Sequence, residues 1–354
     1  MNGSKPEFEV PGRLVIQSVE VMTGMDFHRK CWVLLLTVPG WTSVTDVTVT
    51  ATGTFKQTLV LFRPFYPFLA VFSYGGERII SSPRDSPVIL IWKATTGTPI
   101  RGPVSFGNGP TSIRLSHDGM RLFACPGGVQ SEVVTMWDIE SGLATCLKLG
   151  SYDSHALAFS HDGNKVFTHS DQPRVRDLVT GNIITSDAAH KGGAHLASFS
   201  SNGDQIISVG ATDGRVIIWD TDFAEKTLKV TANHDLKHSG VIESLAYSHN
   251  TSWFVLGLSD GKILLMDSAM GNLVSCFPRH RDRVSSVAFS PDGQLIVSCS
   301  FDRRIWVWNT LTGLPFAGPL EGHMDNVRTV LFSPDGKKIL STSDDGSVRV
   351  WTLQ

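Results

Sequence analysis

The stretch HRDRVSSVAFSPDGQLIVSCSFDRRIWVWN, residues His280–Asn309, is followed by a near-copy, HMDNVRTVLFSPDGKKILSTSDDGSVRVW, residues His323–Trp351. Trp308 and Trp351 hold the same place in the two copies and are 43 residues apart. A fixed period of this size is typical of a modular array, in which each repeat is one supersecondary unit that needs its neighbours to bury its apolar face.

Each repeat has the pattern of a small antiparallel sheet. In the last copy, residues 327–331 alternate apolar and polar side chains, as a half-buried strand does. Residues 333–336 read SPDG, which is turn chemistry, and residues 338–343 form a second predicted strand. A hairpin turn at 344–346 leads to a third strand at 347–351. In copies that continue, a Thr-Gly or Ser-Gly turn leads to a fourth strand. Four such strands in about 40–45 residues predict one blade of a β-propeller.

The ends of the third strands resemble the tryptophan–aspartate (WD) repeat family, over about residues 58–354. They read IleTrpLys at 91–93, MetTrpAsp at 136–138, IleTrpAsp at 218–220, ValTrpAsn at 307–309 and ValTrp at 350–351. The third and fifth repeats carry Arg176 and Met266 where Trp is expected. The resemblance implies an all-β propeller, with seven blades as the preferred prediction and eight as the alternative.

The resemblance also implies a buried network that links a His, a Ser or Thr, an Asp and the Trp of one repeat. A buried carboxylate is tolerated only when it is hydrogen-bonded. Residue by residue, the sixth and seventh repeats match fully, and the fourth has Ala211 at the expected Ser position. The fifth has Leu258 and Met266 at the Ser and Trp positions. The matching residues are His280, Ser300, Asp302 and Trp308; His323, Ser343, Asp345 and Trp351; His190, Asp213 and Trp219; and His238 and Asp260.

Residues 1–57 lack the motif but have β-rich patterning, with predicted strands at 14–21, 31–38 and 44–52. In one interpretation the strand at 57–62 closes a seven-bladed ring by pairing with the last strand, and the residues before it are appended strands. In the other, residues 10–62 form a degenerate eighth blade. The predicted domains are therefore residues 1–57 as a β-rich segment and residues 58–354 as the propeller.

Composition excludes several classes of function. The chain has 354 residues, 41% of them hydrophobic, with a formal net charge of −2. No charge run predicts a nucleic-acid or membrane surface, and no apolar run is long enough to cross a bilayer. The five cysteines are scattered, which is typical of reduced thiols inside a cell. We therefore expect a cytoplasmic location, with the nucleus as an alternative, and no secretion.

No catalytic motif is found. Zinc-protease, phosphate-loop, nucleophile-elbow and CxxC patterns are all missing from the sequence. His155, His161 and His169 raise the idea of a metal site, but turn and surface histidines are the simpler explanation. We expect no enzyme activity, no cofactor and no metal.

The family resemblance places partner binding on the face that carries the loops into each first strand and the hairpins between second and third strands. Aromatic and Arg side chains are the usual energetic anchors of an interface. The predicted protein-binding face comprises Tyr66, Phe68, His155, Glu243, Arg283, Phe301, Asn326, Arg328 and Asp344.

The predicted function is a non-catalytic scaffold for protein or peptide partners, as a monomer or as a subunit of a hetero-complex. The wording of the repeats looks most like the C-terminal arrays of fungal NOD-like receptors. A ligand-sensing relative of those receptors, or the substrate-recognition subunit of a larger complex, is the alternative.

Overall fold

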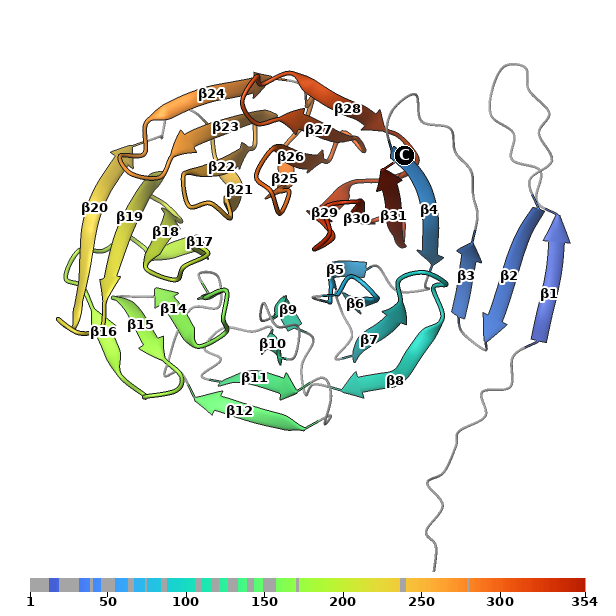
Figure 1. Cartoon of the computed structure of the whole chain (residues 1–354), viewed down its shortest axis with the longest axis horizontal. Coiled ribbons are helices and arrows are strands. Elements are labelled where there is room, and N and C mark those ends of the chain that lie inside the picture. Colours follow the sequence, from blue (N-terminus) through green and yellow to red (C-terminus); the bar gives the residue numbers. More distant parts are fainter. Residues whose placement is uncertain are drawn as a thin grey trace, which may run out of the picture.

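The computed structural model describes residues 13–18, 32–38, 41–45, 55–62, 67–73, 75–83, 88–105, 110–115, 121–126, 133–138, 143–148, 157–169, 172–235, 240–278 and 280–353. These residues form β-strands and turns, and the strands make seven antiparallel sheets. The sheets stand as blades around a central axis, with the first strand of each blade innermost and the last at the rim (Figure 1). The all-β fold and the seven blades are as predicted, and the eight-bladed alternative is wrong.

The first three blades follow one another along the chain. Their strands are β5 (Pro67–Phe72), β6 (Arg78–Pro83), β7 (Val88–Lys93) and β8 (Pro99–Ser105); β9 (Pro110–Leu115), β10 (Arg121–Pro126), β11 (Val133–Asp138) and β12 (Ala144–Lys148); and β13 (Leu157–Phe159), β14 (Lys165–His169), β15 (Pro173–Asp177) and β16 (Ile183–Thr185).

Blades four to six repeat the same order. They comprise β17 (Ala194–Phe199), β18 (Gln205–Gly210), β19 (Arg215–Asp222) and β20 (Thr227–Asp235); β21 (Ile242–Tyr247), β22 (Trp253–Leu258), β23 (Lys262–Asp267) and β24 (Leu273–Pro278); and β25 (Val284–Phe289), β26 (Leu295–Ser300), β27 (Ile305–Asn309) and β28 (Pro315–Leu320).

The seventh blade joins the two ends of the described chain. It contains β29 (Val327–Phe332), β30 (Lys338–Ser343) and β31 (Ser347–Leu353), and its fourth strand is β4 (Phe55–Phe62). β4 pairs antiparallel with β31, from Ser347 opposite Phe62 to Leu353 opposite Phe55. This pairing covers a sheet edge that would otherwise be open.

Three further strands continue the seventh sheet outward. β3 (Trp41–Thr45) pairs with β4, β2 (Trp32–Val38) pairs with β3, and β1 (Arg13–Ser18) is the outermost strand. They lie outside the ring beside β4 (Figure 1). The predicted boundary between residues 57 and 58 falls inside β4, and the division into two domains stays a proposal.

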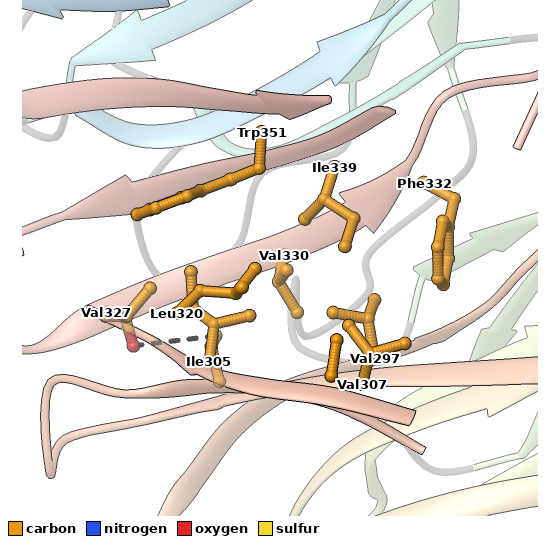
Figure 2. Packing of buried hydrophobic residues seen from close by; sticks show 11 residues of the cluster. Val297, Ile305, Val307, Leu320, Val327, Val330, Phe332, Ile339 and Trp351 are labelled. Carbon is orange, nitrogen blue, oxygen red and sulfur yellow. Dashed lines mark hydrogen bonds between the residues drawn. The ribbon is translucent and has the colours of Figure 1, made fainter. Parts of the chain in front are cut away.

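The core consists of apolar layers between neighbouring blades. In the layer between blades 6 and 7, Trp351 and Ile339 of blade 7 meet Val297, Ile305 and Val307 of blade 6 (Figure 2). Trp308 packs likewise against blade 5, and Trp219 against blade 3. Because each Trp is buried against the preceding blade, no blade can complete its core alone.

Within the described residues there is no helix long and apolar enough to cross a membrane.

Candidate functional site

The framework of the site is a hydrogen-bonded network inside blade 6. His280 precedes β25, and its Nδ1 lies 3.1 and 3.2 Å from the carboxylate oxygens of Asp302 in the hairpin between β26 and β27. Its Nε2 lies 2.8 Å from Ser298 Oγ, and Trp308 Nε1 donates to the same Oγ at 2.9 Å. Since the Ser hydroxyl accepts from Trp308, its proton is available for His280 Nε2, and Nδ1–H donates to Asp302.

The prediction that Ser300 is the network serine is wrong: Ser298 holds that place. Residues two apart lie on the same face of a strand, so either serine fits the alternation. The pairing of β26 with β27 decides which of the two hydroxyls reaches Trp308 and His280. Ser300 has a different role, because its Oγ donates to the carbonyl of Asp282 at 3.0 Å and accepts from the Asp302 amide at 3.0 Å. It ties the hairpin to the loop that enters β25.

Blade 7 has the same geometry, and the prediction of Ser343 fails in the same way. His323 lies 2.9 Å from Asp345 and 2.8 Å from Ser341 Oγ, which also accepts from Trp351 Nε1 at 2.9 Å. Ser343 Oγ donates instead to the carbonyl of Asp325 at 3.0 Å.

The network of blade 4 is complete, although Ala211 at the expected position had suggested that it lacks a serine. Ser208 Oγ lies 2.8 Å from His190 Nε2 and accepts from Trp219 Nε1 at 2.8 Å, while His190 Nδ1 is 3.3 Å from both oxygens of Asp213. A serine 10 or 11 residues before each network Trp is the sequence signal that would have found Ser208, Ser298 and Ser341.

Blade 5 replaces the network with apolar packing. Leu256, not the predicted Leu258, stands at the position of Ser298, and both leucines and Met266 are buried. Asp260 is exposed and binds Lys262 Nζ at 2.7 Å. His238 lies outside the described residues.

Burial and hydrogen bonding oppose each other at the network carboxylates. Burial raises the pKa of Asp302, but hydrogen bonds from His280 and from the Arg281 and Arg304 amides outweigh it, so the pKa lies below the usual value. The pKa of Asp345 is depressed in the same way by His323, Ser347 and the Met324 amide. Burial lowers the pKa of His323, which therefore stays neutral at neutral pH.

Six of the predicted face residues form one continuous surface across blades 5 to 7, which we call the blade 6 face. At its centre is Phe301, half-buried, whose ring centroid lies 5.1 Å from Arg283 Cζ and 4.5 Å from Arg328 Cζ. Guanidinium groups within about 6 Å of a ring centroid are attracted to the π electrons. Phe301 therefore holds two cations as well as offering an aromatic surface.

The other members of the face pair with these two arginines. Arg328 donates Nε–H and Nη2–H to the Asp344 carboxylate, the latter at 2.6 Å, and Asn326 Nδ2 donates to Asp344 at 3.3 Å. Arg283 Nη1 lies 3.6 Å from Glu243 Oε1. Bidentate pairing makes Arg328 the rigid cation, whereas Arg283, 48% exposed, is the accessible one.

The remaining predicted face residues are not placed with this group. Tyr66 and His155 lie outside the described residues. Phe68 lies on β5, and only its backbone is described.

His169 differs from the prediction of turn and surface histidines, because its side chain is fully buried. It lies between blades 3 and 4, with ring centroids 5.3 Å from His190 and 6.3 Å from Trp219. His161 is half-buried at its turn, with its ring 5.6 Å from that of His249. In the part of the chain that the structure describes, no three His, Cys, Asp or Glu side chains are grouped to hold a metal ion.

The chain contains WD repeats. The family model described as "WD domain, G-beta repeat" matches residues 181–220, 271–309 and 316–352. The second and third matches begin at or near the outer strand of one blade and end on the third strand of the next, so each repeat links two neighbours. WD-repeat propellers are generally non-catalytic and bind proteins.

Curated relatives are similar over parts of the chain. Autophagy-related protein 16 of Arabidopsis thaliana is 27% identical over 177 residues, 49% of this chain and 34% of the relative. Apoptotic protease-activating factor 1 of Mus musculus is 28% identical over 182 residues, 51% of this chain and 14% of the relative. The guanine nucleotide-binding protein subunit beta of Oryza sativa subsp. japonica is 28% identical over 148 residues, 38% of each. The matched part is thus well under half of each relative's length.

Proposed function

We propose that this protein is a non-catalytic scaffold that binds protein or peptide partners through the blade 6 face. The observation that carries the proposal is the Phe301 ring, which lies against the guanidinium groups of both Arg283 and Arg328. Aromatic and Arg side chains anchored in place lose little entropy on binding, so they are suited to carry binding energy.

The rigidity of the surrounding framework supports this role. The Phe301 amide donates to the Arg283 carbonyl at 3.2 Å, and the next residue, Asp302, is fixed by His280. A propeller of this kind positions its loops on strands, and sites built on strands are held more accurately than sites on long loops.

The test uses the double variant Arg283→Ala/Phe301→Ala in a pulldown from cell extract, followed by affinity measurement with the recovered partner. Truncating interface anchors typically costs about 2 kcal/mol or more, and we expect affinity to fall roughly thirtyfold. A general hydrolase screen on the wild-type protein runs in parallel.

Gln294→Ala, beside the SPDG turn on the opposite face, is the matched control and should bind normally. Loss of binding in the Gln294 variant alone would place the interface on the opposite face. A drop of several degrees in melting temperature for the double variant would mean that Phe301 serves packing, because only the loss of two cation–π contacts is expected.

The narrower alternatives are a ligand-sensing propeller related to fungal NOD-like receptors and a substrate-recognition subunit. One relative, the guanine nucleotide-binding protein subunit beta, is by its name a subunit of a complex, and this similarity favours a role inside a complex. Size-exclusion chromatography of the extract, with the protein detected by antibody, would place it in a complex or leave it at its own mass of 38.6 kDa.

A further inference from the structure

The hairpin of blade 6 departs from the other described hairpins at two positions. Residues 301–304 read FDRR, where blades 4, 5 and 7 have TDGR, SDGK and DDGS. Gly214, Gly261 and Gly346 occupy the position after the Asp with φ values of 62°, 87° and 82°. Arg303 takes that position with φ of 70°. A side chain in this left-handed region strains the backbone, and glycine avoids that strain.

Three other arginines lie on this hairpin or on the loop that contacts it. Arg281 and Arg283 belong to the loop that enters β25, and Arg304 follows Arg303. The two loops are clamped together: Asp302 accepts from the amides of Arg281, at 2.9 Å, and Arg304, at 3.0 Å. The Ser300 hydroxyl adds a further link between them. We call these four side chains, with Phe301, the arginine facet.

Among the described residues, the side-chain donors of this facet have few hydrogen-bond partners. The Arg283–Glu243 and Arg304–Glu321 distances are 3.6 and 3.7 Å, too long for hydrogen bonds. Arg281 and Arg303 are exposed. Guanidinium groups pair with carboxylates through two parallel hydrogen bonds, so the facet is complementary to anionic side chains.

Acidic side chains around the facet limit which anion fits. Asp282 and Asp325 are exposed, Glu321 is 66% exposed, and Asp344 is half-buried beside Arg328. The formal net charge of the chain is −2. A nucleic-acid strand, with a phosphate at every step, would meet these carboxylates, whereas a peptide with a few spaced acidic residues avoids them.

We propose that the arginine facet recognises a segment of a partner protein that carries Asp or Glu side chains. The proposal rests on the proposed function and names the chemistry of the partner. Arg303 is the informative residue, because it holds the position that glycine holds in blades 4, 5 and 7 despite the backbone strain, which points to a role for its side chain.

The experiment pans a displayed library of random 12-residue peptides against three proteins. These are the wild type, the variant Arg281→Gln/Arg303→Gly, and the control Lys191→Gln/Arg215→Gln. The control removes the same charge from the corresponding loops of blade 4, where the Lys191 amide likewise binds Asp213. We expect Asp and Glu to be enriched in peptides bound by the wild type and the control, and not by the facet variant.

An enriched peptide, labelled with fluorescein, is then measured by anisotropy. The facet variant should raise Kd at least tenfold, the control less than twofold, and replacing the peptide's Asp and Glu by Asn and Gln should match the loss in the facet variant. Arg303→Gly alone should weaken binding while its melting temperature stays equal or rises by about 1–2 °C, as relief of backbone strain predicts.

Three results would overturn the proposal: acid-free peptides dominate, the facet variant binds as tightly as the wild type, or only a phosphoserine version of the peptide or an RNA oligonucleotide binds. If acid-free peptides lose binding in Arg283→Ala/Phe301→Ala, the scaffold function survives without this partner chemistry. Peptides that bind the wild type and all variants equally would contradict both the scaffold function through the blade 6 face and the proposed partner chemistry.

Discussion

At the scale of single residues, the buried carboxylates of blades 6 and 7 are the most consequential polar groups. Asp302 accepts hydrogen bonds from His280 and from two backbone amides, and Asp345 has the corresponding partners. Each carboxylate is thus the junction of a hairpin, a loop and the histidine that contacts the network serine.

Removing either carboxylate should destabilise the protein. We expect Asp302→Ala and Asp345→Ala each to lower the free energy of unfolding by about 1–3 kcal/mol, because buried donors lose their acceptor. Chemical denaturation monitored by tryptophan fluorescence measures this.

Asp162→Ala is the matched control, since Asp162 is an exposed turn residue that accepts from Ser160 Oγ at 2.6 Å and from the Asn164 amide at 3.0 Å. Its loss should lower the free energy of unfolding by less than about 1 kcal/mol. Equal losses for all three variants would contradict the special role of the networks.

At the scale of elements, the contact between blades 3 and 4 contains an unusual histidine. His169 ends β14 and is fully buried, and neither of its ring nitrogens has a hydrogen-bond partner among the described residues. Burial, together with the nearby His190, lowers its pKa to about 4, against an opposing effect of Asp213. The corresponding positions of blades 4 and 6 are Val209 and Cys299, which do not titrate at these pH values.

This contact between blades 3 and 4 should weaken in acid. Below pH 6.5 the unfolded chain binds a proton at residue 169 before the folded chain does, so stability falls as the pH drops from about 6.5 to about 4, by on the order of 3 kcal/mol. We expect the melting temperature of the wild type to fall more steeply over this range than that of His169→Val.

The substitution also changes the packing and the number of unpaired polar atoms by an amount that does not depend on pH, so the comparison uses the slope of melting temperature against pH and not its absolute value. His190 and His323, whose pKa values are also lowered by burial, remain in both proteins and contribute to the residual slope. Equal slopes for the two proteins would contradict a lowered pKa of His169 in the folded protein.

At the scale of the whole molecule, closure of the ring depends on β31. This strand pairs with β30 on one side and with β4 on the other, and it carries Trp351 into the layer between blades 6 and 7. It therefore joins strands that are almost 300 residues apart in sequence.

Deleting residues 348–354 should abolish cooperative folding, because it exposes strand edges on both sides and empties a core layer. Solubility, size-exclusion chromatography and thermal melting measure the outcome. A truncated chain that stays monomeric and melts near the full-length temperature would contradict closure through β31.

The repeat pattern alone determined the all-β propeller and the positions of Trp219, Trp308 and Trp351, but it left seven and eight blades open until the pairing of β4 with β31 decided the count. Period and alternation are local properties, and a strand's alternation states which side chains share a face. Alternation alone could not distinguish Ser298 from Ser300, because both lie on one face of β26. The spacing to the Trp separates them, but its meaning is known only from the structure, in which the pairing with β27 brings the Ser298 hydroxyl to Trp308 and His280. It also could not reveal that His169 is buried, since the burying surface comes from blade 4. The tertiary structure likewise decided that the Phe301 ring of blade 6 lies against Arg283 of its own blade and Arg328 of blade 7. Contacts between blades depend on how sheets pack, and that information is spread over residues distant in the chain.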